Sequence, residues 1–128
     1  MTRVNAGIRP EELPNKLLIA EHREITRIPN AIKSGRAKIV NIPSTFRLNT
    51  GHVKFFYTRL LYIKKRYYAL YDECKSRQFD VTAKHSAFDG LSQQLMNDYE
   101  ASEQDRQLII ERIEQRGFKL LHMDTLTT

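Results

Sequence analysis

Hydrophobic and polar positions in the stretch KLLIAEHREITRI, residues 16–28, recur with the period of an α-helix. Apolar side chains gather on one side of the predicted helix and basic side chains on the other, with Glu24 at the edge of the basic strip. The apolar stripe contains Leu17, Leu18, Ile25, Ile28 and Ile32, and the basic strip contains Lys16, Arg23 and Arg27. Spacing alone favours an ordinary ion-pair network around Glu24 over an acid held among phosphate-binding groups.

This first long helix is predicted to run from about Glu11 to Lys33, with Gly35 as the stop. Pro29 lies inside that range, so a kink or break is expected there. Glu21 falls within the apolar stripe and therefore needs a partner if the helix is oriented as predicted. The residues before the helix show no clear period, and we expect them to lie against the body of the protein.

A second helix is predicted from an apolar stripe in steps of three and four, with Asn49 or Thr50 as its cap. Lys64, Lys65 and Arg66 form a basic cluster on this helix, which is either a solvated face or a contact with a phosphate backbone. The stripe consists of Val53, Phe56, Leu60, Ile63, Tyr67, Leu70 and Cys74, and we interpret Cys74 as buried filler rather than as a nucleophile.

A third helix is predicted to begin at a capping box formed by Ser102 and Asp105 and to end at Gly117. Arg112 and Arg116 project from it one turn apart, and Leu108, Ile109 and Ile113 are expected to be buried. Between the main helices we expect an ordered connection over residues 39–51 and, over residues 78–97, a loop with one short helix. In the basic loop that follows the first helix, Arg36 and Lys38 are either solvated or in contact with phosphate. The pattern predicts a compact all-α fold, with three main helices in one domain spanning residues 1–128.

The composition fits one soluble domain in a reducing compartment. The chain has 128 residues, 41% of them hydrophobic and 28% charged, and it contains no apolar run of membrane-spanning length and no signal-peptide pattern. One cysteine excludes an internal disulfide and suits the cytoplasm. The four histidines show no metal-ligand spacing, so no metal site is expected.

Charge is distributed unevenly between the two halves of the chain. Residues 1–66 carry 14 Lys and Arg against 4 Asp and Glu, whereas residues 67–128 carry 7 against 11. A basic half indicates a polyanionic ligand, most simply the phosphates of DNA.

Several segments resemble the pyrimidine-dimer DNA glycosylase family, which is typified by the endonuclease V of T-even phages. The N-terminal MTRVN, then AEHREITRI, then PSTFRLNTGHVKFFYTRLLYIKKRYYALYDEC occur in the family's order, and a weaker match covers residues 98–116. The resemblance implies a small all-α enzyme with glycosylase and abasic-site lyase activities. It also implies a covalent mechanism that uses the amino group of residue 2.

By this resemblance Thr2 is the nucleophile, Glu24 is the catalytic carboxylate, and Arg3, Arg23 and Arg27 hold phosphates and shape the pocket. The candidate DNA-binding residues are Arg3, Lys16, Arg23, Arg27, Lys64, Lys65, Arg112 and Arg116. No metal or organic cofactor is required. The expected partner is double-stranded DNA with a damaged base, and no membrane partner is expected. The protein is expected to act as a monomer in the cytoplasm, which would be that of a bacterial host if a phage encodes it.

Residue 2 offers chemistry that an ordinary lysine does not. Thr2 is small, so removal of Met1 is expected and exposes an α-amine with an unperturbed pKa of about 7.7–8.0. Nearby arginines are expected to lower that pKa further through like-charge repulsion. A lysine amine, with a pKa of about 10.4, needs a much larger perturbation to react as a neutral nucleophile at pH 7.

The sequence departs from the family in its shorter loop after the first helix, in Lys16 and Leu17 where the family has glutamine and histidine, and in its C-terminal residues. GFKLLHMDTLTT contains no tryptophan and does not match the family's aromatic tail. Two alternatives therefore stay open. One is the same chemistry on another damaged or modified base, and the other is a non-catalytic basic helical protein that binds DNA.

Overall fold

The computed structural model describes residues 1–121, in which helices are joined by long connections and no strand occurs. The predicted all-α fold is confirmed, and the three longest helices are α1, α4 and α5. In chain order the elements are the 3-10 helix η1 (Pro10–Glu12), α1 (Asn15–Ile25), α2 (Arg27–Lys33), α3 (His52–Phe55), η2 (Phe56–Thr58), α4 (Leu60–Ser76), η3 (His85–Phe88), η4 (Gln93–Leu95) and α5 (Glu103–Gln115).

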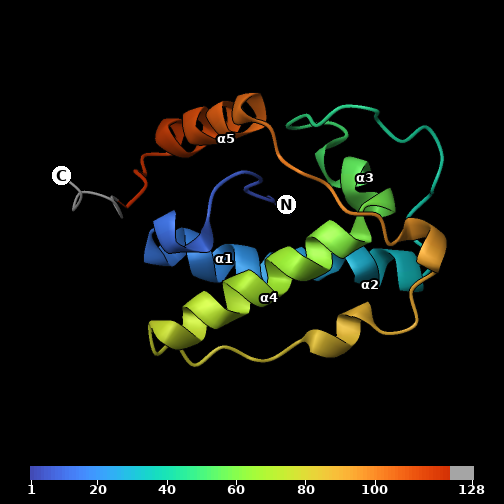
Figure 1. Ribbon diagram of the computed structural model, residues 1–128, viewed down its shortest axis with the longest axis horizontal. Coiled ribbons are helices and arrows are strands. Elements are labelled where there is room, and N and C mark those ends of the chain that lie inside the picture. Colours follow the sequence, from blue (N-terminus) through green and yellow to red (C-terminus); the bar gives the residue numbers. More distant parts are fainter. Residues whose placement is uncertain (122–128) are drawn as a thin grey trace.

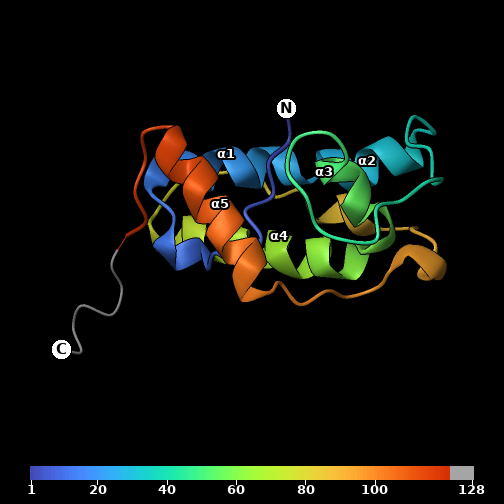
Figure 2. The same cartoon turned by 90° about the horizontal axis from the view of Figure 1, so that it is seen from above.

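Helices α1 and α4 pack against each other, and α5 crosses over both of them (Figures 1 and 2). The N-terminal segment, residues 2–9, runs between α5 on one side and α1 and α4 on the other (Figure 1). Val4, Ala6 and Ile8 are fully buried in this segment. The expectation that the first residues lie against the body of the protein is therefore confirmed, and the chain's beginning forms part of the core.

The first predicted helix begins later and breaks earlier than expected. Pro14 is the extended residue before α1, and the Leu18 amide donates to its carbonyl at 3.0 Å. The break falls at Thr26 instead of Pro29, so Pro29 lies in the first turn of α2. This position is compatible with proline because a first-turn residue needs no amide hydrogen, whereas in a continuous helix the ring would clash with the carbonyl of Ile25.

The second predicted helix is interrupted at Arg59, whose φ of −130° and ψ of 47° separate η2 from α4. The Arg59 amide donates to Phe56 O at 2.9 Å and therefore not to Phe55 O, which would be its acceptor in a continuous α-helix. The Arg59 guanidinium takes that place, because its Nη1 donates to Phe55 O at 2.7 Å and its carbon lies 3.8 Å from the centre of the Phe55 ring. The stripe itself is buried as predicted, apart from the half-buried Val53.

The predicted cap of this region is wrong. No side chain caps α3, and Gly51 occupies the cap position with a φ of +89°. The amide of His52 donates to the backbone carbonyl of Asn49 at 3.0 Å, so the turn is closed by main-chain atoms.

At the end of the chain, the Ser102–Asp105 capping box is confirmed, and Gly117 follows α5 in the left-handed conformation with a φ of +88°. Ile109 and Ile113 are fully buried, but Leu108 is 36% exposed, contrary to prediction. The buried face is centred on the Ile109 and Ile113 pair, and Leu108 lies about 100° around the helix from Ile109. Residues 78–97 contain η3 and η4 where one short helix was expected.

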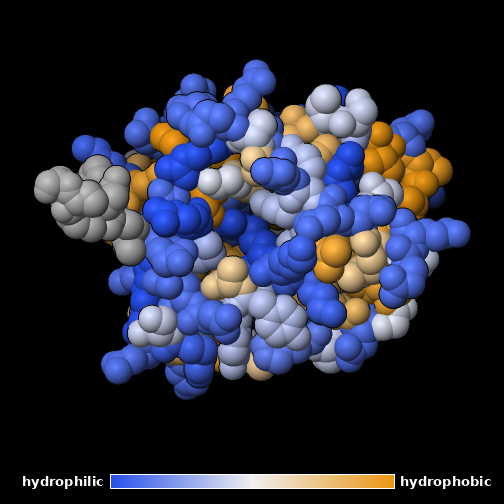
Figure 3. Space-filling view, in the orientation of Figure 1, coloured by the Kyte–Doolittle hydropathy of each residue, from blue (hydrophilic) through white to orange (hydrophobic). Residues whose placement is uncertain are grey.

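One face of the molecule is mostly hydrophilic (Figure 3). Apolar atoms gather at the end where the connection between α2 and α3 lies, and in that connection Ile39 and Val40 are 38% and 55% exposed. Within residues 1–121, no helix combines the length and apolar character that crossing a membrane requires.

Candidate active site

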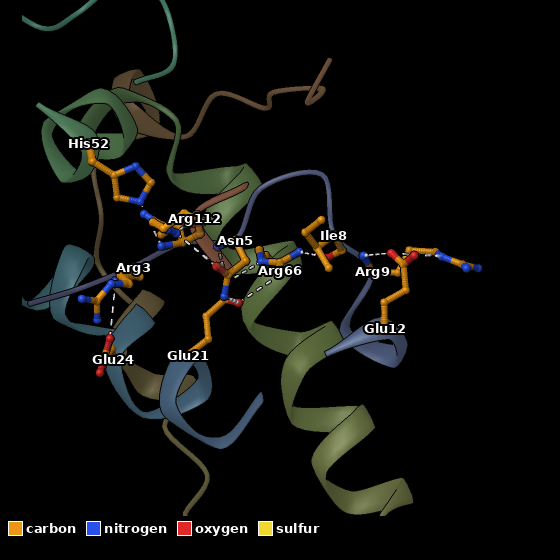
Figure 4. A network of polar contacts seen from close by, with 11 residues as sticks. Arg3, Asn5, Ile8, Arg9, Glu12, Glu21, Glu24, His52, Arg66 and Arg112 are labelled. Atoms are coloured by element: carbon orange, nitrogen blue, oxygen red, sulfur yellow. Dashed lines mark hydrogen bonds and ion pairs between the residues drawn. The ribbon is translucent and has the colours of Figure 1, made fainter. Parts of the chain in front are cut away.

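The N-terminal segment is held in place by polar side chains of four helices, α1, α3, α4 and α5 (Figure 4). Glu21 on α1 accepts from the Asn5 amide at 3.2 Å and from the Asn5 side chain at 2.8 Å. Both residues are at most 3% exposed. Because Glu21 occupies the apolar stripe, its carboxylate loses its hydrogen bonds to water on folding, and these two bonds replace part of them.

Arg66 on α4 completes the pairing of Glu21. Its Nε and Nη2 lie 2.5 and 3.0 Å from the two carboxylate oxygens, and its Nη1 donates to Ile8 O at 2.8 Å. Burial alone would lower the pKa of Arg66, but the charge and hydrogen bonds of Glu21 outweigh it and raise that pKa. The expected partner for Glu21 thus exists. The placement of Arg66 in a solvated basic cluster is wrong, since this residue is 8% exposed and joins α4 to α1 and the N-terminal segment.

Helix α5 holds the same segment from the other side. Arg106 donates to Gly7 O at 3.0 Å and forms two hydrogen bonds to the Glu12 carboxylate, which lower the pKa of Glu12. Arg112 donates to the Asn5 side-chain oxygen at 3.1 Å and to Val4 O at 3.5 Å. Burial, with a contribution from the nearby charge of Arg3, lowers the pKa of Arg112 to about 10.

His52 on α3 also bonds to the N-terminal segment, at Val4. His52 Nε2 accepts from the Val4 amide at 2.9 Å, and Nδ1 lies 2.8 Å from Arg47 O. A carbonyl can only accept, so Nδ1 carries the hydrogen and Nε2 offers a lone pair. Burial lowers the pKa of His52 to about 4, so the ring is neutral at pH 7.

Glu24, one turn after Glu21, faces the first residues of the chain. Its Oε1 accepts from the Arg3 amide at 3.4 Å, and its Oε2 lies 3.6 Å from Arg23 Nη2. Arg27, the first residue of α2, donates to Met1 O at 3.3 Å. The peptide joining residues 2 and 3 therefore lies beside a carboxylate, with arginines on two helices around it.

Two cavities flank this point. A cavity of about 590 Å³ includes Thr2, Arg3, His52, Tyr57, Arg112 and Arg116 in its lining. A second cavity, of about 310 Å³, is lined by Lys16, Arg23, Glu24 and Arg116 among others. Arg116 borders both cavities, and a smaller hollow lined by Arg3, Glu24 and Arg116 among others shares residues with each of them. Burial, followed by repulsion from Arg3, lowers the pKa of Arg116.

Most of the candidate residues are thus gathered in one place by the structure. Lys64 and Lys65 are not among them. Lys65 pairs with Asp98 at 2.6 Å beside a separate open hollow lined by Tyr62 and Tyr99. Their contact with DNA remains a prediction.

The sequence did not indicate Asn5, His52 or Tyr57 as site residues. His52 and Tyr57 lie within a stretch whose aromatic pattern reads as core, and nothing local marks His52 as an acceptor for Val4. The one signal of a buried polar network in the sequence was the carboxylate of Glu21 within the apolar stripe, and it gave no indication of Asn5, His52 or Tyr57.

Chemically, the arrangement places a carboxylate and several cations around Thr2. Removal of Met1 would expose the α-amine of this residue. The cations can hold phosphates, and the carboxylate can stabilise a positive charge that develops next to it. Within the described residues, no group of three or more His, Cys, Asp or Glu side chains is arranged to hold a metal ion.

The sequence model of a family described as pyrimidine dimer DNA glycosylase matches residues 1–87. This span includes the N-terminal segment, α1 to α4, and the residues Thr2, Arg3 and Glu24. Arg112 and Arg116 lie beyond it.

Proposed function

Because the chain belongs to the pyrimidine dimer DNA glycosylase family, we propose that this DNA repair glycosylase also cleaves abasic sites, acting on cyclobutane pyrimidine dimers through a covalent intermediate. The nucleophile is the α-amine of Thr2 after removal of Met1. The protein acts as a monomeric single domain on double-stranded DNA, in the cytoplasm.

In the proposed reaction, the amine attacks C1′ of the damaged nucleotide. The new C1′–N bond forms as the glycosidic bond breaks, and the departing base takes that bond's electron pair. Loss of a proton and opening of the sugar ring give a Schiff base. Removal of a C2′ proton then expels the 3′ phosphate oxygen, which breaks the strand by β-elimination.

Glu24 serves this reaction through its charge and its position. Its carboxylate stabilises the cationic sugar as the base departs and takes part in the proton transfers that follow. Arg3, Arg23 and Arg27 hold the phosphates on either side of the lesion, and Lys16, Arg112 and Arg116 add positive charge around the two cavities.

One observation carries the proposal. Glu24 Oε1 is 3.4 Å from the Arg3 nitrogen, so the carboxylate lies against the peptide that adjoins the amine of residue 2. Only the α-carbon and carbonyl carbon of Thr2 separate these two nitrogens. An ordinary ion pair on a helix surface would not require the chain's first residues to fold onto it.

The other candidate functions differ in substrate or in chemistry. The absence of a match to the family's aromatic tail keeps open the same reaction on an oxidised or otherwise modified base. A non-catalytic DNA-binding protein would need the basic surface but not Glu24 beside residue 2. Cleavage assays on dimer-containing, oxidised-base and plain abasic duplexes distinguish these three possibilities.

The decisive experiment traps the intermediate. Borohydride added during the reaction reduces the C=N bond of a Schiff base to a stable amine, so protein becomes covalently joined to DNA. We expect an adduct on dimer-containing duplex, and peptide mapping should place it on the α-amine of Thr2. Blocking the terminus, either by reductive methylation at mild pH or by retaining Met1 through a bulky residue 2, should abolish trapping and cleavage together.

Lys16 provides the matched control, because it carries another amine in the lining of the cavity that Glu24 also borders. Lys16→Ala should leave trapping intact and lower only the affinity for DNA, through a lost phosphate contact. Trapping that followed Lys16 and ignored the terminus would contradict the proposed nucleophile. If no adduct formed on any of the three substrates, the non-catalytic reading would replace the proposal.

A further inference from the structure

The reaction proposed above requires the amine of residue 2 to be held at a fixed place, although it is the free end of the chain. A free terminus ordinarily frays, because few contacts oppose its conformational entropy. The backbone of the first residues must therefore be restrained by the protein. The question is which group provides the restraint closest to the amine without itself being needed for the chemistry.

The bonds to the segment occur at successive residues. Glu24 accepts from Arg3, His52 accepts from Val4, and Glu21 accepts from Asn5. The contact of Glu24 is long, at 3.4 Å, and its carboxylate is engaged by Arg23 as well. The bond from Val4 to His52 measures 2.9 Å, which makes it the short, well-formed bond nearest the amine.

His52 is itself held rigidly. Its Nδ1–H donates to Arg47 O, and its ring packs edge-on against Phe46 and Phe56 with centroid separations of 5.5 and 5.6 Å. The residue is 3% exposed. Both ring nitrogens are satisfied, which fixes the tautomer and the orientation of the lone pair toward Val4.

We propose that His52 is a positioning residue for the N-terminal amine: by accepting from the Val4 amide, it fixes the backbone two residues from Thr2 and so holds the amine against Glu24. This inference rests on the proposed function, and it adds a residue that takes no part in the proposed chemical steps.

The same residue joins the nucleophile's segment to the wall of the larger cavity. Arg47 lies in the connection between α2 and α3, and His52 lines the cavity together with Thr2. His52 therefore fixes the position of that connection relative to the N-terminal segment, because it bonds to both. Displacement of a reacting group by about 1 Å can cost about 10² in rate, so the bond affects the chemical step more than it affects the binding of DNA.

The test compares two substitutions at His52. His52→Phe keeps a flat ring between Phe46 and Phe56 but leaves the buried Val4 amide without an acceptor. His52→Gln can place its carbonyl oxygen near the position of Nε2 and restore the acceptor. Single-turnover cleavage of a dimer-containing duplex, the dissociation constant for that duplex, and the rate of borohydride trapping are measured for each.

We expect His52→Phe to slow cleavage and trapping by about 10- to 100-fold while the dissociation constant changes less than about threefold. His52→Gln should recover most of the lost rate. Tyr67→Phe is the matched control, because it removes the acceptor of another backbone amide, that of Lys84 at 2.6 Å, outside the cavities. This control should match wild type in cleavage rate even if its melting temperature falls.

Two outcomes overturn the inference: a His52→Phe protein that cleaves at the wild-type rate, or equal slowing by His52→Phe and Tyr67→Phe at equal loss of stability. A direct check is available in the NMR spectrum of the wild-type protein. The imidazole ¹⁵N shifts should report a protonated Nδ1 and a hydrogen-bonded, unprotonated Nε2, and the opposite tautomer would also overturn it. If wild-type protein formed no adduct at Thr2, the proposed function would fail instead, whereas the NMR result would still stand.

Discussion

Glu21 and Glu24 lie one turn apart on α1, and their surroundings give them different tasks. Glu21 is 2% exposed, and both of its oxygens are occupied by Asn5 and Arg66. The side chain of Glu24 is 13% exposed, and its contacts, with Arg23 and the Arg3 amide, are both longer than 3.3 Å. A carboxylate so loosely engaged can respond to charge that forms on a substrate, whereas Glu21 is committed to the fold.

Glu24→Gln tests this assignment at the scale of one residue. The substitution keeps the size and an oxygen that can accept from Arg3, but it removes the negative charge. Cleavage at a dimer should fall by at least about 10², since acid–base groups contribute about 10²–10⁴. Affinity for DNA should persist or rise, because a negative charge has left a phosphate site.

Glu73→Gln is the control for that measurement. Glu73 lies on α4 and pairs with Arg77, four residues later, at 2.8 Å. Glu73 lines neither cavity. Its loss should leave the cleavage rate unchanged. Near-normal cleavage by Glu24→Gln would reduce Glu24 to a helix ion pair.

Among the elements, the N-terminal segment is the one that depends most on exact packing. Gly7 has a φ of +83°, and an added Cβ would lie 3.0 Å from Arg106 Cβ and 3.1 Å from Arg106 Cα. The glycine therefore lets the segment pass directly against α5, which in turn lets Arg106 reach Gly7 O and Glu12. Any side chain at this position separates the segment from the helix.

We expect Gly7→Ala to lower the free energy of unfolding by at least about 2 kcal/mol, measured by urea denaturation. Left-handed backbone alone costs an alanine about 1–2 kcal/mol, and the contact with Arg106 adds to this. Gly90→Ala isolates the backbone effect, because Gly90 has a φ of +74° and its Cβ would meet nothing within 4 Å. Equal losses for the two variants would show that Gly7 is required for its dihedral angle alone.

On the scale of the whole molecule, the fold concentrates cations from distant segments. Arg3, Arg23 and Arg27 come from the basic half of the chain, and Arg116 comes from the acidic half. Arg3, Arg23 and Arg116 nevertheless line the two cavities, and Arg27 donates to the carbonyl of Met1, which lines the larger one. Uneven charge along the sequence thus becomes a local positive surface. Such a surface binds the phosphate backbone without reading the sequence of bases.

Binding to undamaged duplex should accordingly weaken steeply with salt. If about five phosphates are contacted, the slope of log K against log [salt] is about −4.5. Arg116→Ala should reduce the magnitude of that slope by about 1, and Lys75→Ala, in the last turn of α4 and in the lining of neither cavity, should not change it. Affinity that did not respond to salt would count against DNA as the ligand. The same titration on Lys65→Ala shows whether the duplex extends to α4.

The periodicity of the sequence was enough to predict the helical fold, the buried stripe of α4 and the capping box of α5, because each depends on residues within a few positions of one another. It also required a partner for Glu21. The resemblance to the family supplied Thr2 and Glu24, which no local pattern would have distinguished from a terminus and an ion pair.

Only the tertiary structure decided which charges are buried and where the helices break. Arg66 was indistinguishable from Lys64 and Lys65 in the sequence, yet it alone meets Glu21, a residue 45 positions away. The contact of His52 with Val4 spans 48 positions. Hydrogen bonds of this kind depend on how α1, α3, α4 and α5 come together around the N-terminal segment, because a side chain's partner is set by packing in space and a local pattern reports only the face on which that side chain lies.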